Sequence, residues 1–130
     1  MCKYVGTWGL YPLFSGDGEE LVYPSDFQKF SKLHAYGKLF HCIGESEGYL
    51  VLQHKLEIYR VKPDLYQPTS TPTFVWGDRV KDKNHPEYVG IIDDIEWHYK
   101  FNNPMYFIVV SGKRKTKRYF ENDLEILDYD

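Results

Sequence analysis

Hydrophobic and polar residues alternate in short runs along most of the chain, and these runs form two similar sets. The first set covers residues 38–43, 49–53 and 56–61, and the second covers residues 88–97, 105–111 and 115–120. Each set is followed by a turn that contains Asp-Leu, at positions 64–65 and 123–124. Alternation with a period of two over such short runs is typical of β-strands. The pattern therefore predicts a mainly β protein built from two similar units.

One segment has a helical pattern instead. Over residues 25–35, large apolar residues recur with helical spacing, at Phe27, Phe30 and Leu33. Ser25 or Asp26 can cap the free N–H groups at the start of this helix, and Gly37 can end it. We expect one short helix in the first unit.

The boundary between the units is predicted from composition. Residues 67–73 read Gln-Pro-Thr-Ser-Thr-Pro-Thr and indicate an extended, stiff linker. The sequence thus predicts a first unit over residues 1–66, with an aromatic loop near its N-terminus, and a second over residues 74–130. Each unit has about 60 residues, near the lower limit for an independent core, so we expect the two to pack together.

Composition supports the β prediction and bears on location. Aromatic residues make up 18% of the chain, whereas alanine occurs only at Ala35, which disfavours a mainly helical fold. There is no signal-peptide pattern and no apolar stretch near the roughly 20 residues that cross a bilayer. We therefore expect a cytoplasmic protein without membrane contact, in which Cys2 and Cys42 are free thiols.

The second half resembles an SH3-like barrel of the KOW and Tudor type. The resemblance rests on Trp76-Gly77-Asp78-Arg79-Val80, on the strand-like runs at 88–92 and 106–110, and on Asn122-Asp123-Leu124-Glu125-Ile126. The first half matches more loosely, over about residues 20–66. The opening at residues 6–12 also resembles small uncharacterised bacterial proteins. The resemblance implies two consecutive SH3-like small barrels, and leaves function to be argued from a site.

A basic run is the sharpest charge feature. Five of the six positions 113–118 are cationic, at Lys113, Arg114, Lys115, Lys117 and Arg118. In a strand, Lys113, Lys115 and Lys117 would share a face suited to phosphate contacts. A solubilising edge strand explains the same run, and an acidic protein partner is a third reading. The net charge of −3 argues against a general nucleic-acid binder.

Aromatic residues are the second candidate surface. Trp97, Tyr99 and Phe101 lie at the end of a predicted strand and in the loop after it, and Trp8 and Tyr11 lie in the N-terminal loop. Such rings can bind a protein partner, although aromatic residues more often fill the core, and the N-terminal loop can equally seal the fold.

Motifs for catalysis and for metal binding are not found in the sequence. The five histidines and two cysteines lack metal-ligand spacing. Neither a nucleophile elbow nor a phosphate-binding loop is present, and Cys42 in an apolar strand is expected to be inert. We therefore expect a non-catalytic binding or adaptor protein without a cofactor. We expect a protein as the first-choice partner. The alternative is a nucleic acid that is bound by the hairpin at 112–118. A small enzyme is the weakest of the three interpretations.

Overall fold

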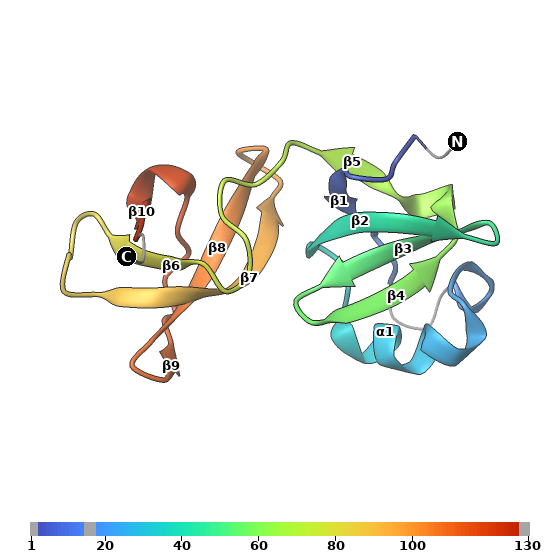
Figure 1. The fold of residues 1–130 in the computed structure, drawn as a ribbon, viewed down its shortest axis with the longest axis horizontal. Helices are drawn as coiled ribbons and strands as arrows, with labels where there is room; N and C mark the ends of the chain where they lie inside the picture. The colour runs from blue at the N-terminus through green and yellow to red at the C-terminus, as the bar shows by residue number, and fades with distance from the viewer. Residues whose placement is uncertain (1–2, 15–17, 128–130) are drawn as a thin grey trace. The chain divides into compact units, whose positions relative to one another are not determined.

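The computed structural model describes residues 3–14 and 18–127, and the chain divides into two compact units, Met1–Thr71 and Pro72–Asp130 (Figure 1). Each unit contains its own five-stranded antiparallel sheet. The prediction of a mainly β fold with two small β units and one short helix in the first is therefore confirmed. Among the described residues, no helix combines the length and apolarity needed to cross a membrane.

The first unit is a meander closed by a short last strand. Its strands are β1 (Trp8–Leu10), β2 (Leu39–Ser46), β3 (Tyr49–His54), β4 (Glu57–Val61) and β5 (Gln67–Thr69). The helix α1 (Phe27–Leu33) lies beside β4 in Figure 1, and Lys29 on α1 forms a 2.9 Å ion pair with Glu57 on β4. Single 3₁₀ turns occur at Glu19–Leu21, Pro24–Asp26 and Pro63–Leu65.

The second unit repeats this arrangement. Its strands are β6 (Arg79–Asp82), β7 (Val89–His98), β8 (Asn103–Val110), β9 (Lys113–Arg114) and β10 (Leu124–Ile126), with a 3₁₀ turn at Glu121–Asp123 before the last strand. The strand orders are β4-β3-β2-β1-β5 and β10-β6-β7-β8-β9, so in both sheets the last strand pairs with the first. The second strand of each unit also has a bulge at a similar place, between Cys42 and Gly44 in β2 and between Ile92 and Asp94 in β7.

The helix differs from its prediction at both ends. It spans seven residues rather than residues 25–35, and the side chain of Asp26 forms no capping hydrogen bond. Instead, Asp26 accepts hydrogen bonds from the Arg60 side chain on β4 at 2.9 and 3.1 Å, and from the Arg60 backbone at 3.0 Å. The helix ends at His34, which adopts a left-handed conformation (φ 56°), before Gly37 is reached. A tertiary ion pair thus replaces the local cap.

The linker prediction also needs correction. Gln67–Thr69 form β5, which pairs with β1 in the register Trp8 to Thr69. The two strands approach closely at Gly9, where an added Cβ would lie 2.6 Å from the carbonyl oxygen of Gln67. Only glycine fits such an approach. Three residues of the predicted linker therefore belong to the first sheet.

The core of the first unit is mostly aromatic and aliphatic side chains of the strands and helix. Phe30 on α1 is 1% exposed and contacts the rings of Tyr11, Phe40 and Tyr59. The Tyr11 hydroxyl donates a 2.6 Å hydrogen bond to the carbonyl oxygen of Lys62. Burial, with a smaller effect of the Asp64 charge, raises the pKa of Tyr11, so the hydroxyl remains a donor. This ring joins the N-terminal segment to the strands.

The second unit has a separate core. Its buried apolar residues come from every strand except the short β9, and include Phe74, Val80, Ile92, Ile95, Tyr106, Ile108, Tyr119 and Leu124. Asp82, at the end of β6, is completely buried beside them. A buried carboxylate needs compensating contacts, and these contacts lie beneath the groove described next.

Candidate functional site

A surface groove of about 500 Å³ lies in the second unit, next to the turn between β8 and β9. Four of the residues that line it are cationic, at Lys113, Arg114, Lys115 and Lys117. His85 and Tyr88, from the segment between β6 and β7, also line the groove, as does Tyr119 from the segment after β9. The groove therefore collects most of the basic run that stands out in the sequence.

The chain after β9 does not form the strand predicted over residues 115–120. Regular pairing ends after Arg114, and only single contacts to β8 follow, such as the Tyr106–Tyr119 bridge. The Lys115 backbone N–H still donates to the carbonyl oxygen of Ile108. Arg114 lines the same groove as Lys113, Lys115 and Lys117, although strict alternation along a strand predicts that it faces away.

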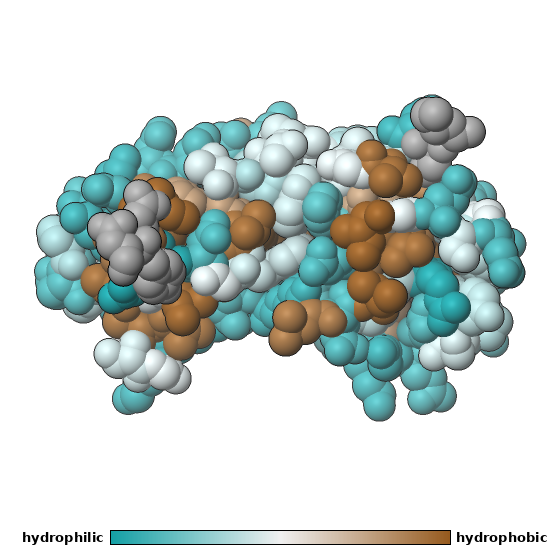
Figure 2. Space-filling view, viewed as in Figure 1, coloured by the Kyte–Doolittle hydropathy of each residue, from teal (hydrophilic) through white to brown (hydrophobic). Residues whose placement is uncertain are grey.

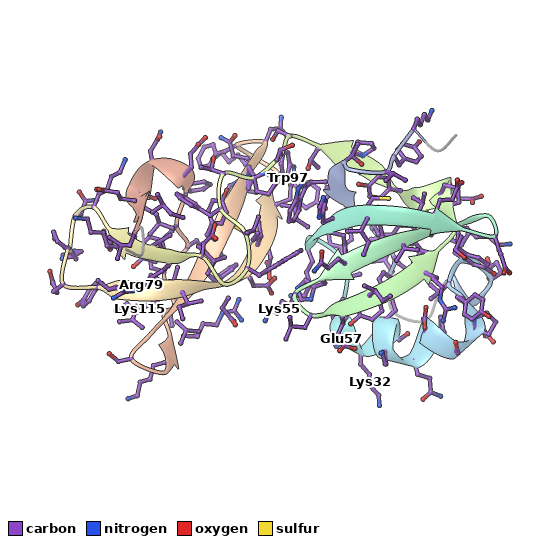
Figure 3. All side chains as sticks on the ribbon, viewed as in Figure 1. Lys32, Lys55, Glu57, Arg79, Trp97 and Lys115 are labelled. Atoms are coloured by element: carbon purple, nitrogen blue, oxygen red, sulfur yellow. The ribbon has the colours of Figure 1, made fainter. Side chains whose placement is uncertain are left out.

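Two lysines of the groove lie over tyrosine rings. The Lys115 ammonium is 3.9 Å from the centre of the Tyr88 ring, and Figure 3 shows Lys115 near the start of β7, which follows Tyr88. The Lys117 ammonium is 4.8 Å from the centre of the Tyr119 ring. Cations are attracted to the faces of aromatic rings, so these contacts restrict the two long side chains. The groove thus presents partly ordered ammonium groups.

The Arg114 side chain is balanced by acidic neighbours. Its guanidinium lies over the Phe107 ring at 4.4 Å and is 3.7 Å from Asp93 and 3.9 Å from Asp94. Arg118, the last cation of the run, is exposed and does not line the groove. The anion-contact set predicted from the sequence is therefore brought together except at Arg118, and part of its charge is already paired.

Asp82 lies beneath the groove and was not among the residues singled out from the sequence. Its Oδ1 accepts hydrogen bonds from the backbone N–H groups of Asn84 (2.8 Å) and His85 (3.2 Å). Its Oδ2 is buried and has no hydrogen bond of ordinary geometry within the described part of the chain. The only local signal is the Asp-Lys-Asn-His sequence, which is typical of a turn closed by an aspartate side chain.

The charge states of Asp82 and Tyr119, which lie under the groove, follow from their contacts. Burial alone would raise the pKa of Asp82, but the backbone hydrogen bonds, the Tyr119 hydroxyl and the Lys117 charge outweigh burial and lower it below its usual value. Burial and the Asp82 carboxylate raise the pKa of Tyr119 to about 12. At neutral pH, a carboxylate and a neutral phenol therefore lie under the groove.

The aromatic contact residues predicted at the β7–β8 turn lie elsewhere in the unit. Phe101 is 57% exposed and Tyr99 47% exposed, whereas Trp97 is half-buried. The His98 ring stacks on Phe101 at 4.6 Å, and His98 Nδ1 accepts a hydrogen bond from the Phe101 backbone. β8, eight residues long, runs from this turn toward the basic turn, a length of about 25 Å. The two candidate surfaces are therefore separate sites.

The aromatic residues predicted as contacts near the N-terminus are buried. Trp8 is 6% exposed and stacks on His41, and Tyr11 is completely buried in the first core. The prediction that they form a contact surface is therefore corrected: side chains this deeply buried have almost no surface to offer a partner.

Other surface features carry less information. Figure 2 shows hydrophobic residues gathered over the β2–β4 sheet of the first unit, where Ile43 and Ile58 are about half exposed. More than half of the surface of a typical folded protein is apolar, so these residues do not by themselves indicate a site. Cys42 is buried, while Cys2 lies outside the described residues. Within residues 3–14 and 18–127, no group of three or more potential metal ligands comes together.

Fold and groove together define a small, mainly β protein of two units, the second of which has a cationic groove. The chain belongs to a family of unknown function, DUF6960, whose model matches residues 1–125. No curated protein and no solved structure matches the chain significantly.

Proposed function

We propose that this chain is a non-catalytic binding protein, and that the groove of its second unit binds an acidic segment of a protein partner. The observation that carries the proposal is the concentration of four cationic side chains around one groove in a chain with a net charge of −3. Such a local reversal of charge favours encounter with an oppositely charged partner.

The aromatic rings of the groove favour a protein over single-stranded nucleic acid. Proteins that bind single-stranded nucleic acid stack its bases on exposed faces of aromatic rings. Here Lys115 lies over the face of Tyr88, and Lys117 lies over Tyr119, whose ring is almost fully buried. The groove therefore offers ammonium and guanidinium groups rather than a stacking platform, and these groups bind carboxylates well.

Nucleic acid remains the second candidate, because five of the six positions 113–118 are cationic and contacts to phosphates require only cations within reach. The acidic neighbours of Arg114 weigh against it, since they already neutralise part of the charge. Double-stranded and single-stranded oligonucleotides therefore belong in the same binding assay.

The fold supports a binding role by analogy. In both sheets the last strand returns beside the first after a single 3₁₀ turn, and this order supports the proposal that each unit is an SH3-like barrel. Barrels of this type serve many binding functions, so the analogy alone identifies no partner. The burial of Cys42, the thiol considered as a nucleophile, supports a non-catalytic role.

The test uses a fluorescent glutamate-rich peptide and fluorescence anisotropy at low salt. We expect the double substitution Lys115→Glu and Lys117→Glu to weaken binding about tenfold, because two attractive contacts become repulsive. The matched control, Lys100→Glu with Arg118→Glu, makes the same change in charge on the same unit outside the groove and should have little effect. Equal losses in both variants would refute a site in the groove, and tighter binding of either oligonucleotide than of the peptide would favour the second candidate.

A further inference from the structure

The groove has opposite charges on its rim and in its floor. The rim carries the exposed residues Lys113 and Lys117 and the partly exposed residue Lys115. The floor contains the carboxylate of Asp82, which is completely buried and yet lines the groove. A groove meant for deep binding of anions would not be expected to have a carboxylate at its base.

The position of this carboxylate is fixed through one of its two oxygens. Its Oδ1 accepts the backbone N–H groups of Asn84 and His85, which hold the segment between β6 and β7. Its other oxygen is buried without a hydrogen bond of ordinary geometry among the described residues, near Lys117 and Tyr119 of the segment after β9. The negative charge therefore cannot move out of the floor without breaking the turn.

Ligands of different shape would meet this charge differently. An extended peptide places its carboxylates on flexible side chains, which can reach the rim lysines without entering the floor. A compact polyanion such as pyrophosphate has to enter the groove to contact several lysines at once, and its charges would then lie close to Asp82. Repulsion between like charges at a partly buried site is much stronger than in water.

We infer that Asp82 determines the specificity of the groove, by excluding compact polyanions from the floor while leaving the rim open to an acidic peptide segment. This inference rests on the proposed function, because it concerns the same groove. Asp82 would thus influence which ligand binds in the groove without contacting that ligand.

The deciding variant is Asp82→Asn. Asparagine has the same shape, its oxygen can still accept the two turn N–H groups, and its amide can donate to the Tyr119 hydroxyl. Removal of the charge should raise the affinity for pyrophosphate about fivefold or more and change the affinity for the glutamate-rich peptide about twofold or less. The matched control is Asp78→Asn. Asp78 also accepts a hydrogen bond from a backbone N–H, that of Val75, but it lies outside the groove. It should change neither affinity.

Isothermal titration calorimetry with both ligands separates the outcomes. Unchanged pyrophosphate affinity in folded Asp82→Asn, or an equal gain in Asp78→Asn, would overturn the inference. If Asp82→Asn does not fold, Asp82→Ser offers a neutral side chain that can also close the turn. The wild-type protein gives an independent result, because pyrophosphate binding as tight as peptide binding would contradict exclusion by Asp82. Failure of the wild-type protein to bind the peptide at all would instead refute the proposed function.

Discussion

Replacing Tyr11 with phenylalanine would remove a single oxygen atom from the core of the first unit. That oxygen donates a 2.6 Å hydrogen bond to the carbonyl oxygen of Lys62 and lies 3.5 Å from that of Leu21. The ring itself, with its edge-to-face contact to Phe30, would remain in place. The substitution therefore isolates one buried hydrogen bond between segments far apart in the sequence.

The expected cost follows from that bond. A buried hydrogen bond contributes about 1 kcal/mol, and leaving the carbonyl oxygen of Lys62 without its donor adds a desolvation cost. We expect Tyr11→Phe to lower the free energy of unfolding of the first unit by about 1.5 kcal/mol. For a unit of this size, that corresponds to a decrease in Tm of about 6–12 °C.

Guanidinium unfolding followed by circular dichroism measures the loss, with Tyr49→Phe as the control. Tyr49 is half-buried in the same unit, and its hydroxyl forms no hydrogen bond among the described residues. Peptide binding should be the same in Tyr11→Phe as in the wild-type protein. A stability change no larger than that of the control, or a loss of binding without a loss of stability, would show that Tyr11 is not the core residue described above.

Two further predictions concern the ion pair of the first unit and the aromatic turn of the second. Hydrogen bonds from the Arg60 side chain hold the pKa of Asp26 below its usual value. The stabilisation by this carboxylate is therefore present above about pH 4 and is lost as the pH falls through the lowered pKa. Urea unfolding should show Asp26→Asn to be less stable than wild type at neutral pH, with the difference shrinking below about pH 4; a constant difference would contradict this linkage. Phe101→Ala should leave peptide binding in the groove unchanged in anisotropy measurements, because the β7–β8 turn lies at the other end of β8; a loss comparable to that of the lysine variant would join the two surfaces into one site.

The sequence predicted those parts of the fold that depend on local patterns. The runs at 49–53 and 56–61 correspond closely to β3 (Tyr49–His54) and β4 (Glu57–Val61), because apolar residues alternate clearly there. The start of the helix was predicted less well. Asp26 is a good local cap, but three hydrogen bonds with Arg60 outweigh one cap, and the sequence does not show that Arg60 lies nearby.

The sequence predicted about half of the candidate site. The run of cations at 113–118 is evident from the sequence alone, so the residues of one wall of the groove were predicted. The other wall depends on the pairing of β6 with β7, which brings Asp82 and Tyr88 close to the hairpin. Asp82 lies between two lysines in a polar stretch and reads as exposed, whereas the structure buries it completely. Whether such a residue is buried depends on the pairing of strands and not on composition.

The pairing of β5 with β1 brings the beginning and the end of the first unit side by side, at Trp8 and Thr69. Chain ends that meet in this way allow circular permutation or insertion of the unit into a surface loop of a host protein with little loss of loop entropy. A permuted gene that joins residue 71 to residue 3 through a short glycine-rich connector, and opens the chain at the exposed Glu47-Gly48 turn, should therefore encode the same sheet.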